Sequence, residues 1–187
     1  MSNVYDKSVN KKFKPARKKH AQLCLALEFL ASSMVTIENY NTKMATELWQ
    51  VYFTSIRMVC IKDYSEEQIK AWAPEPFDLN FFKEKMDEIN PFVAILKRKI
   101  IGYADLQTDG LIDHFFVHGE YQGIGAGTAL MRKILKEGSS KPKLYSYVSH
   151  TAKPFYINHG FVLEKVHQEE IRGCKIENNI MVRKNKF

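Results

Sequence analysis

The sequence has few cysteines, prolines and glycines for its length. Its 187 residues include three cysteines, six prolines and nine glycines. The cysteines are odd in number, far apart and without a CxxC pair, which argues against a disulfide framework and against a cysteine-rich zinc site. We therefore expect no metal centre and a reducing, cytoplasmic location. The low proline and glycine content excludes a collagen-like or low-complexity chain.

Long uncharged hydrophobic runs are also absent. The longest apolar stretch, residues 21–30, already contains Glu28, and a membrane span needs roughly eighteen apolar residues. The sequence therefore excludes an integral membrane protein. Hydrophobic residues make up 45% of the chain and charged residues 26%, which is typical of one folded globular domain.

The positive charge lies mostly at the N-terminus. The net charge is +7, of which residues 1–33 carry +5 and the remainder +2. The body therefore has no strong electrostatic preference for phosphates, and a nucleic-acid partner is not expected.

Residues 1–33 admit three interpretations: a targeting segment, an arm that binds nucleic acid, or an upstream extension with no separate role. We expect an extension, helical over residues 20–33, where Leu23, Leu27 and Leu30 share one face. Under this hypothesis Met34 is the natural start, and residues 34–187 form a single domain.

From residue 34 onward, strand-like and helix-like segments alternate without an internal repeat, which predicts an α/β protein. We expect a mixed, mostly antiparallel, twisted sheet flanked by helices. The expected N-caps include Thr42 and Ser65, and a terminal hairpin turns at Arg172 and Gly173. Strands are expected at residues 35–40, 92–96, 100–107, 111–117, 144–148, 161–171 and 175–183, and helices at residues 42–61, 65–72, 77–89, 123–138 and 152–159.

A glycine-rich segment, Tyr-Gln-Gly-Ile-Gly-Ala-Gly at residues 121–127, lies between an expected strand and an expected helix. Unpaired N–H groups at a helix N-terminus suit a phosphate, and glycines allow close approach. A P-loop is excluded because Thr128, not a lysine, follows Gly127. A dinucleotide site is excluded because the spacing is GxGxG and no acidic residue follows about twenty positions later. The remaining ligand of this type is the pyrophosphate of coenzyme A.

Two motifs resemble the GNAT superfamily of acetyl-CoA-dependent N-acetyltransferases. Gln122-x-x-Gly125-x-Gly127 matches that family's Q/R-x-x-G-x-G/A signature, and residues 152–161 resemble its A-x-x-F-Y-x-x-x-G-F segment. The element order follows the family over residues 35–183 and leaves out the extension. The resemblance implies a GNAT-like fold in which strands four and five splay apart.

The resemblance also implies direct transfer of an acetyl group from acetyl-CoA to a primary amine of a small molecule or a protein. In this family the edge of strand four receives the pantetheine arm, and the glycine-rich loop receives the pyrophosphate, mainly through main-chain groups. We expect Phe155 and Phe161 to be core residues instead. The expected cofactor-binding residues are Phe115, Phe116, Val117, Gln122, Gly123, Ile124, Gly125, Ala126, Gly127 and Thr128.

Acetyl transfer needs a group that protonates the departing thiolate and a base that takes a proton from the amine. Tyr156 matches the family's tyrosine near the CoA sulfur and is the candidate acid. Asp113 is the candidate base, because it shares its strand alternation with Phe115 and Val117. Family members that place an acidic residue on this face have it nearer the strand's start, where this chain has Leu111.

Two histidines are alternative bases. His114 should point to the opposite face of the strand, and His150 follows strand five. A metal ion shared by His114 and His118 is excluded, because four residues along a strand span about 13 Å.

The sequence does not identify the amine acceptor. In this fold the first two helices and the terminal hairpin select it, here around Tyr52, Trp72 and Cys174. An alternative function is a GNAT-like module that holds acyl-CoA or associates with nucleic acid without turnover. Oligomeric state is left open between a monomer and a homodimer joined at a sheet edge.

Deleting residues 1–33 tests the proposed domain boundary. We expect the shortened chain to keep its soluble yield and melting temperature, because the first expected strand begins only after Met34. A large loss of either quantity would show that the extension is integral to the fold.

Overall fold

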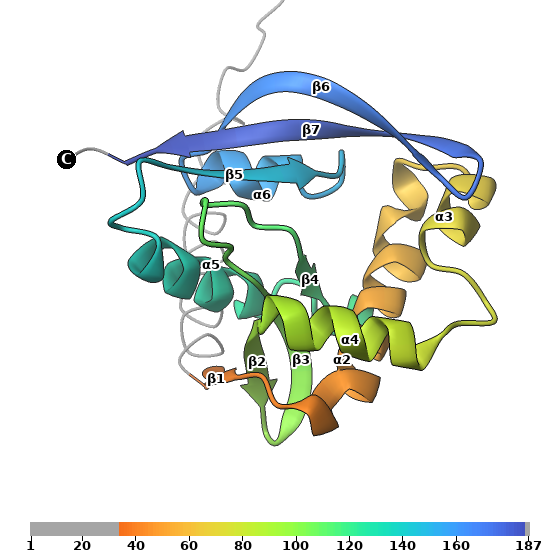
Figure 1. The fold of residues 1–187 in the computed structure, drawn as a ribbon, viewed down its shortest axis with the longest axis horizontal. Coiled ribbons are helices and arrows are strands. Elements are labelled where there is room, and N and C mark those ends of the chain that lie inside the picture. The colour runs from red at the N-terminus through yellow and green to blue at the C-terminus, as the bar shows by residue number, and fades with distance from the viewer. Residues whose placement is uncertain (1–33, 186–187) are drawn as a thin grey trace, which may run out of the picture.

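The computed structural model describes residues 34–185 and shows two antiparallel sheets (Figure 1). The sheet order β1-β2-β3-β4 comprises β1 (Thr36–Asn39), β2 (Phe92–Leu96), β3 (Lys99–Ala104) and β4 (Phe115–Val117). The order β5-β7-β6 comprises β5 (Lys143–Val148), β6 (Val162–Ile171) and β7 (Cys174–Lys184). The predicted mixed, mostly antiparallel architecture is confirmed. The expected helix at residues 20–33 lies outside the described residues.

The helices are α2 (Ala45–Thr54), α3 (Glu66–Trp72), α4 (Leu79–Ile89), α5 (Ala126–Glu137) and α6 (Lys153–Asn158). Ser65 caps α3 in the predicted capping box with Gln68. Asp78 caps α4, and Asn90 ends it in the left-handed region at φ 41°. Within residues 34–185, every helix is too short or too polar to cross a bilayer.

The predicted helix over residues 42–61 is a composite. It comprises the 3₁₀ turn η1 (Thr42–Met44), α2, the π-helical η2 (Ser55–Val59) and the 3₁₀ turn η3 (Cys60–Lys62). Its N-cap is Asn41 and not the expected Thr42. The Asn41 side chain accepts a hydrogen bond from the Lys43 N–H. The Thr54 hydroxyl donates to the Gln50 carbonyl and accepts from the Gly119 N–H. This side-chain bonding lies directly before the π-helical turn, where α-helical periodicity is lost.

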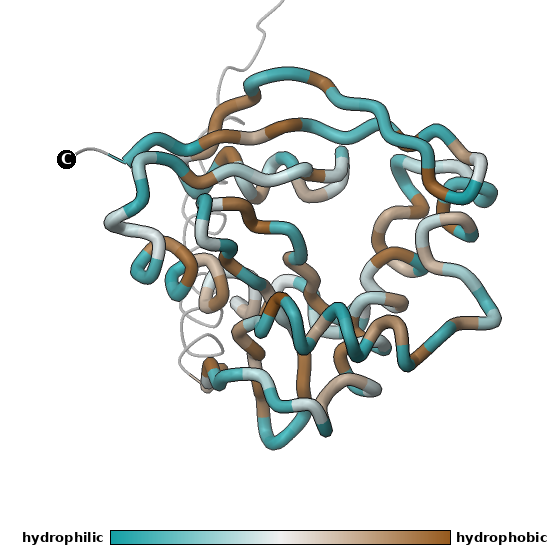
Figure 2. Tube along the Cα trace, in the orientation of Figure 1, coloured by the Kyte–Doolittle hydropathy of each residue, from teal (hydrophilic) through white to brown (hydrophobic). Residues whose placement is uncertain are grey.

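The core lies on both faces of the first sheet because side chains alternate along β2 and β3. Ala94 and Ala104 pack toward α5 and α6, whereas their neighbours Val93 and Tyr103 pack toward α2 and α4. Hydrophobic colour is concentrated on these inner strands, and hydrophilic colour dominates β6 (Figure 2). A third cluster joins η2 and α3 to Ile176 of β7. The second sheet is thereby connected to the helices that precede β2.

The two sheets touch only briefly at the point where β4 and β5 would be neighbours. An isolated parallel bridge joins Leu111 to Tyr145, with hydrogen bonds from Ile112 N–H to the Tyr145 carbonyl (2.8 Å) and from Tyr145 N–H to the Gly110 carbonyl (3.0 Å). Beyond this bridge the strands belong to different sheets. The predicted splay of strands four and five is therefore confirmed.

The predicted strand over residues 111–117 is too long, because only Phe115–Val117 forms β4. The side chain of Asp105, directly after β3, accepts the His114 backbone N–H at 2.6 Å. A carboxylate oxygen thus takes the N–H that a regular ladder would give to a backbone carbonyl. The regular pairing begins only at Ala104 and Phe115.

Asp105 and His114 are buried polar groups whose pKa values move in opposite directions. Asp105 is 0% exposed, and desolvation raises the pKa of its carboxyl to about 6. Desolvation lowers the pKa of His114 to about 4, while Asp113 raises it and Lys85 lowers it further. The His114 Nδ1 lies 3.0 Å from the Tyr103 hydroxyl. Both shifts disfavour a charge in this interior.

These shifts predict opposing pH dependences of the free energy of unfolding. Between about pH 4 and 6 the folded state holds more protons than the unfolded state at Asp105, so stability falls as pH rises. At His114 the unfolded state holds more protons, so stability rises over the same range. Each contribution is on the order of 3 kcal/mol.

Urea unfolding of Asp105→Asn and His114→Gln across this pH range measures the two contributions. The free energy of unfolding of each variant is compared with that of the unsubstituted protein at the same pH. This difference should rise with pH for Asp105→Asn and fall with pH for His114→Gln. Parallel pH profiles for both variants would contradict the assigned shifts.

Candidate active site

A pocket of about 510 Å³ lies where β4 separates from β5. Backbone and side chains of both strands line it, together with the N-terminus of α5, α6, η2 and the end of α3. The expected cofactor residues that line it are Phe115, Phe116, Val117, Gln122, Gly123, Gly125, Ala126, Gly127 and Thr128. Ile124 is not in the lining and packs against the hydrophobic core. The two candidate catalytic residues, Asp113 and Tyr156, also line the pocket.

The glycine loop, residues 122–128, leads into the N-terminus of α5. Gly123 and Gly125 have φ values of 73° and 89°, a region that favours glycine. The first α-helical backbone bond runs from Ala129 N–H to the Gly125 carbonyl. Within residues 34–185, the preceding amides of α5 have no helical acceptor. They therefore form a site of positive potential suited to a phosphate.

Two contacts hold the glycine loop against its surroundings. The Gln122 side-chain amide donates to the Val117 carbonyl at the end of β4, at 2.7 Å. A Cβ at Gly127 would lie 3.3 Å from the Phe155 ring, so α5 and α6 pack closely there. The glutamine of the motif thus fixes the loop to the strand, and this role explains its position before the glycines.

The edge of β4 that faces β5 has no strand partner within the described residues. β4 pairs with β3 from Ala104–Phe115 to Gly102–Val117, and its other edge borders the pocket. An extended chain with amide groups can add to such an edge by main-chain hydrogen bonds. The pocket therefore suits a ligand with an amide-bearing arm and a phosphate-bearing end.

Tyr156 of α6 is 2% exposed and meets the pocket from beneath β5. Its hydroxyl donates to Ser146 Oγ at 3.3 Å, and Ser146 donates to the Ile112 carbonyl at 2.8 Å. Burial raises the pKa of the Tyr156 phenol above its usual range, so the group holds its proton at neutral pH. The residue that the motif singles out is thus a neutral hydroxyl that lines the pocket.

Asp113 lies before β4 and reaches toward α4. Its Oδ2 lies 3.2 Å from Lys85 Nζ, and its side chain is 37% exposed. Lys85 also lies 3.8 Å from Glu88. The ion pair fixes the direction of the carboxylate at the pocket. Because Asp113 precedes the strand, the expected alternation with Phe115 and Val117 does not extend to it.

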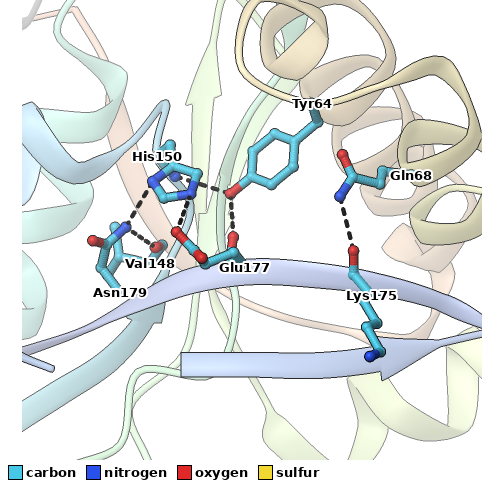
Figure 3. Close-up of polar contacts among 7 residues, drawn as sticks. All are labelled: Tyr64, Gln68, Val148, His150, Lys175, Glu177 and Asn179. Carbon is cyan, nitrogen blue, oxygen red and sulfur yellow. Dashed lines mark hydrogen bonds and ion pairs between the residues drawn. The ribbon is translucent and has the colours of Figure 1, made fainter. Parts of the chain in front are cut away.

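The alternative bases face other groups. The His114 ring lies between Tyr52 and Tyr103 on the α2 side. The ring of His150 has both nitrogens engaged: Nε2 lies 3.3 Å from Glu177 Oε1, and Nδ1 lies 3.3 Å from the Asn179 side-chain amide (Figure 3). Neither histidine is in the pocket lining. Of the three candidate bases, Asp113 is the one that lines the pocket.

Some residues that line the pocket lie outside the two sequence motifs and could not be predicted from them. They come from the β5 edge, from η2 and from α5, and they include Ser55, Val59, Arg132, Tyr147 and Val148. Phe155, expected as core, packs against the core and also lines the pocket, whereas Phe161 is 1% exposed and entirely core. Hydrophobic runs predict the strands that carry such residues but do not show which strand edges remain unpaired.

Of the three residues expected near the amine acceptor, only Trp72 lines the pocket. Tyr52 lies behind it and donates to the Trp72 carbonyl at 3.0 Å. Cys174 lies at the start of β7, with its thiol 3.9 Å from the Glu67 carbonyl. Over residues 34–185, no group of three or more histidines, cysteines or acidic residues has the geometry to hold a metal ion.

Comparison with known proteins identifies the family. Residues 60–176, more than half of the chain, match the family described as "Acetyltransferase (GNAT) domain". The uncharacterized N-acetyltransferase YafP of Escherichia coli K12 is 31% identical over 147 residues, which cover 79% of this chain and 94% of YafP.

Solved structures agree with this match. A GCN5-related N-acetyltransferase from Rhodopseudomonas palustris aligns with a TM-score of 0.76 and 26% identity over 80% of this chain and 94% of that one. The PaiA N-acetyltransferase of Thermoplasma acidophilum, solved with coenzyme A, shares the fold at a TM-score of 0.59 and 20% identity over 80% of this chain and 98% of that one. The pocket, the glycine loop and these relatives together show that the chain belongs to the GNAT family of N-acetyltransferases.

Proposed function

We propose that the protein transfers the acetyl group of acetyl-CoA directly to a primary amine of a small molecule or a protein. The observation that carries the proposal is the pocket between β4 and β5, which has free strand-edge amides along one side and the glycine loop at one end. The solved relatives support it, since the PaiA structure contains coenzyme A and the YncA structure from Salmonella typhimurium contains acetyl-CoA.

The proposed cofactor position follows from the chemistry of the lining. The diphosphate accepts hydrogen bonds from the amides of residues 123–128, where the positive end of α5 adds to the attraction. The pantetheine arm extends along Phe115, Phe116 and Val117 and hydrogen-bonds to the backbone groups of this strand that face away from β3. Arg132 of α5 also lines the pocket and adds a cation for a phosphate group.

The proposed reaction joins the amine nitrogen to the thioester carbon. As the C–N bond forms, Asp113 takes a proton from the nitrogen, either directly or through one water molecule. The C–S bond then breaks, and Tyr156 donates its hydroxyl proton to the departing thiolate. In the free protein this proton is donated to Ser146 Oγ at 3.3 Å, so the hydroxyl turns from Ser146 to the sulfur for the transfer. The products are an N-acetylated amine and free CoA.

Three further features of the protein stay proposals. We propose a cytoplasmic location, supported by the free thiols of Cys60 and Cys174. The division into an extension, residues 1–33, and one catalytic domain, residues 34–187, stays a prediction. A homodimer also stays a prediction, with β6 offering an edge strand that has no second partner among the described residues.

Release of CoA thiol from acetyl-CoA in the presence of amines tests the proposed reaction. Tyr156→Phe should lower kcat by about a hundredfold while leaving the Kd for acetyl-CoA unchanged, because only the proton donor is lost. Asp113→Asn should also lower kcat, because the amide cannot accept the proton of the amine. The matched control Tyr145→Phe alters a tyrosine on β5 that hydrogen-bonds to Asp109 and does not line the pocket. Unchanged kinetics in both site variants would remove these roles.

A further inference from the structure

One wall of the pocket is apolar. The acceptor end, defined here as Val59, Cys60, Trp72 and Phe116, receives its residues from η2, η3, α3 and β4. Cys60 is 6% exposed, and Trp72 and Phe116 are partly buried. If acetyl-CoA occupies the glycine loop and the β4 edge, this wall is the part of the lining left for the acceptor amine. Its non-reacting part then contacts aromatic and aliphatic surface.

Carboxylates on this side of the pocket are already engaged by other groups of the chain. Asp113 pairs with Lys85 at 3.2 Å, and Glu177 pairs with His150 at 3.3 Å. Asp63 accepts a hydrogen bond from Thr151 at 2.6 Å. Asp113 is the one acidic residue in the lining contributed by residues 34–185. A polycation such as a polyamine requires several uncompensated carboxylates, and the acceptor end does not supply them.

Trp72 is held in place from two sides. Its carbonyl accepts from the Tyr52 hydroxyl at 3.0 Å, and the next carbonyl, of Ala73, accepts two bonds from the Arg57 guanidinium at 2.7 and 2.9 Å. The Trp72 indole meets the Tyr64 ring edge-on, with centroids 5.4 Å apart. The carbonyl bonds fix the backbone at Trp72, and the Tyr64 contact fixes the indole ring. A ring held in this way can select among ligands, because reorienting it to fit a poor ligand breaks the contact with Tyr64.

Tyr64 connects this wall to the second sheet (Figure 3). Its hydroxyl accepts from the His150 backbone N–H at 2.9 Å and donates to the Glu177 carbonyl at 2.9 Å. His150 lies just past the end of β5, so the tyrosine supplies the acceptor that a strand partner would otherwise provide. The Gln68 side chain adds a bond to the Lys175 carbonyl at 2.8 Å. The segment that carries Trp72 is thereby tied to both β5 and β7.

We infer that the acceptor is a monoamine with an aromatic or other flat apolar body, which packs against Trp72 while its nitrogen lies near Asp113. This inference rests on the proposed function and names the substrate class of the same site. Trp72 determines specificity by direct contact. Tyr64 is a positioning residue, because it acts through Trp72 and the end of β5.

Thiol release with three amines at saturating acetyl-CoA tests the inference on the unsubstituted protein. Phenethylamine represents the proposed class, spermidine represents polycations, and a lysine-containing peptide represents protein acceptors. We expect kcat/KM for phenethylamine to exceed both others by at least about tenfold, the usual value of one apolar pocket contact. Its KM should also change less than about twofold between low and high salt, because apolar contacts are not screened.

Two variants test the roles of Trp72 and Tyr64 in substrate selectivity. Trp72→Leu should lower the ratio of kcat/KM between phenethylamine and spermidine by about tenfold and leave the Kd for acetyl-CoA unchanged. Tyr64→Phe should raise the KM for phenethylamine with a smaller change in kcat. The controls are Phe81→Leu, an aromatic on α4 that is 67% exposed, and Tyr40→Phe, which loses a hydroxyl bond to Asp87 away from the pocket. Both controls should keep the ratio and the KM.

The outcomes distinguish this inference from the proposed function. Turnover of spermidine or the peptide at least as efficient as that of phenethylamine overturns the inference and leaves the acetyltransferase intact. An unchanged selectivity ratio in Trp72→Leu overturns the role of Trp72. Absence of thiol release with every amine, despite acetyl-CoA binding, overturns the proposed function itself.

Discussion

The pocket of this protein exists because β4 and β5 do not hydrogen-bond to each other beyond a single bridge. β4 and β5 meet only at the Leu111–Tyr145 bridge and then join different sheets. An edge amide in a buried groove costs free energy unless something pairs with it. The structure uses one side chain, Gln122, to occupy the Val117 carbonyl and leaves the rest of the β4 edge facing the pocket. Binding of an amide-bearing ligand is the natural way to complete this edge.

The buried polar groups around the opening favour neutral forms. Tyr156 keeps its proton because burial raises the pKa of its phenol, and desolvation lowers the pKa of His114 to about 4. Asp105 uses its carboxylate to hold the His114 N–H just before β4 begins. The more exposed Asp113 forms an ion pair with Lys85. The proposed acid and base therefore differ in environment, as their opposite tasks require.

Local signals in the sequence predicted much of the fold and the glycine loop before α5. The capping box at Ser65, the alternation in residues 92–96 and the glycines before α5 each depend on contacts within a few residues. The start of β4 and the break in the helix at η2 involve non-local bonds, from the His114 N–H to the Asp105 side chain and from the Gly119 N–H to the Thr54 side chain. The acceptor end was only partly predicted, since Trp72 lines it but Tyr52 and Cys174 do not. A residue's depth behind such a wall is set by tertiary packing, which periodicity does not encode.

Calorimetric titration with two ligands tests the central claim most directly. Acetyl-CoA and S-acetylpantetheine share the reactive arm, but only acetyl-CoA carries the diphosphate that the glycine loop should bind. The account predicts saturable binding of acetyl-CoA and at least about a hundredfold weaker binding of S-acetylpantetheine, because hydrogen bonds to a charged group are each worth about 1.5–3 kcal/mol. No heat with acetyl-CoA, or equal affinity for both ligands, would contradict it.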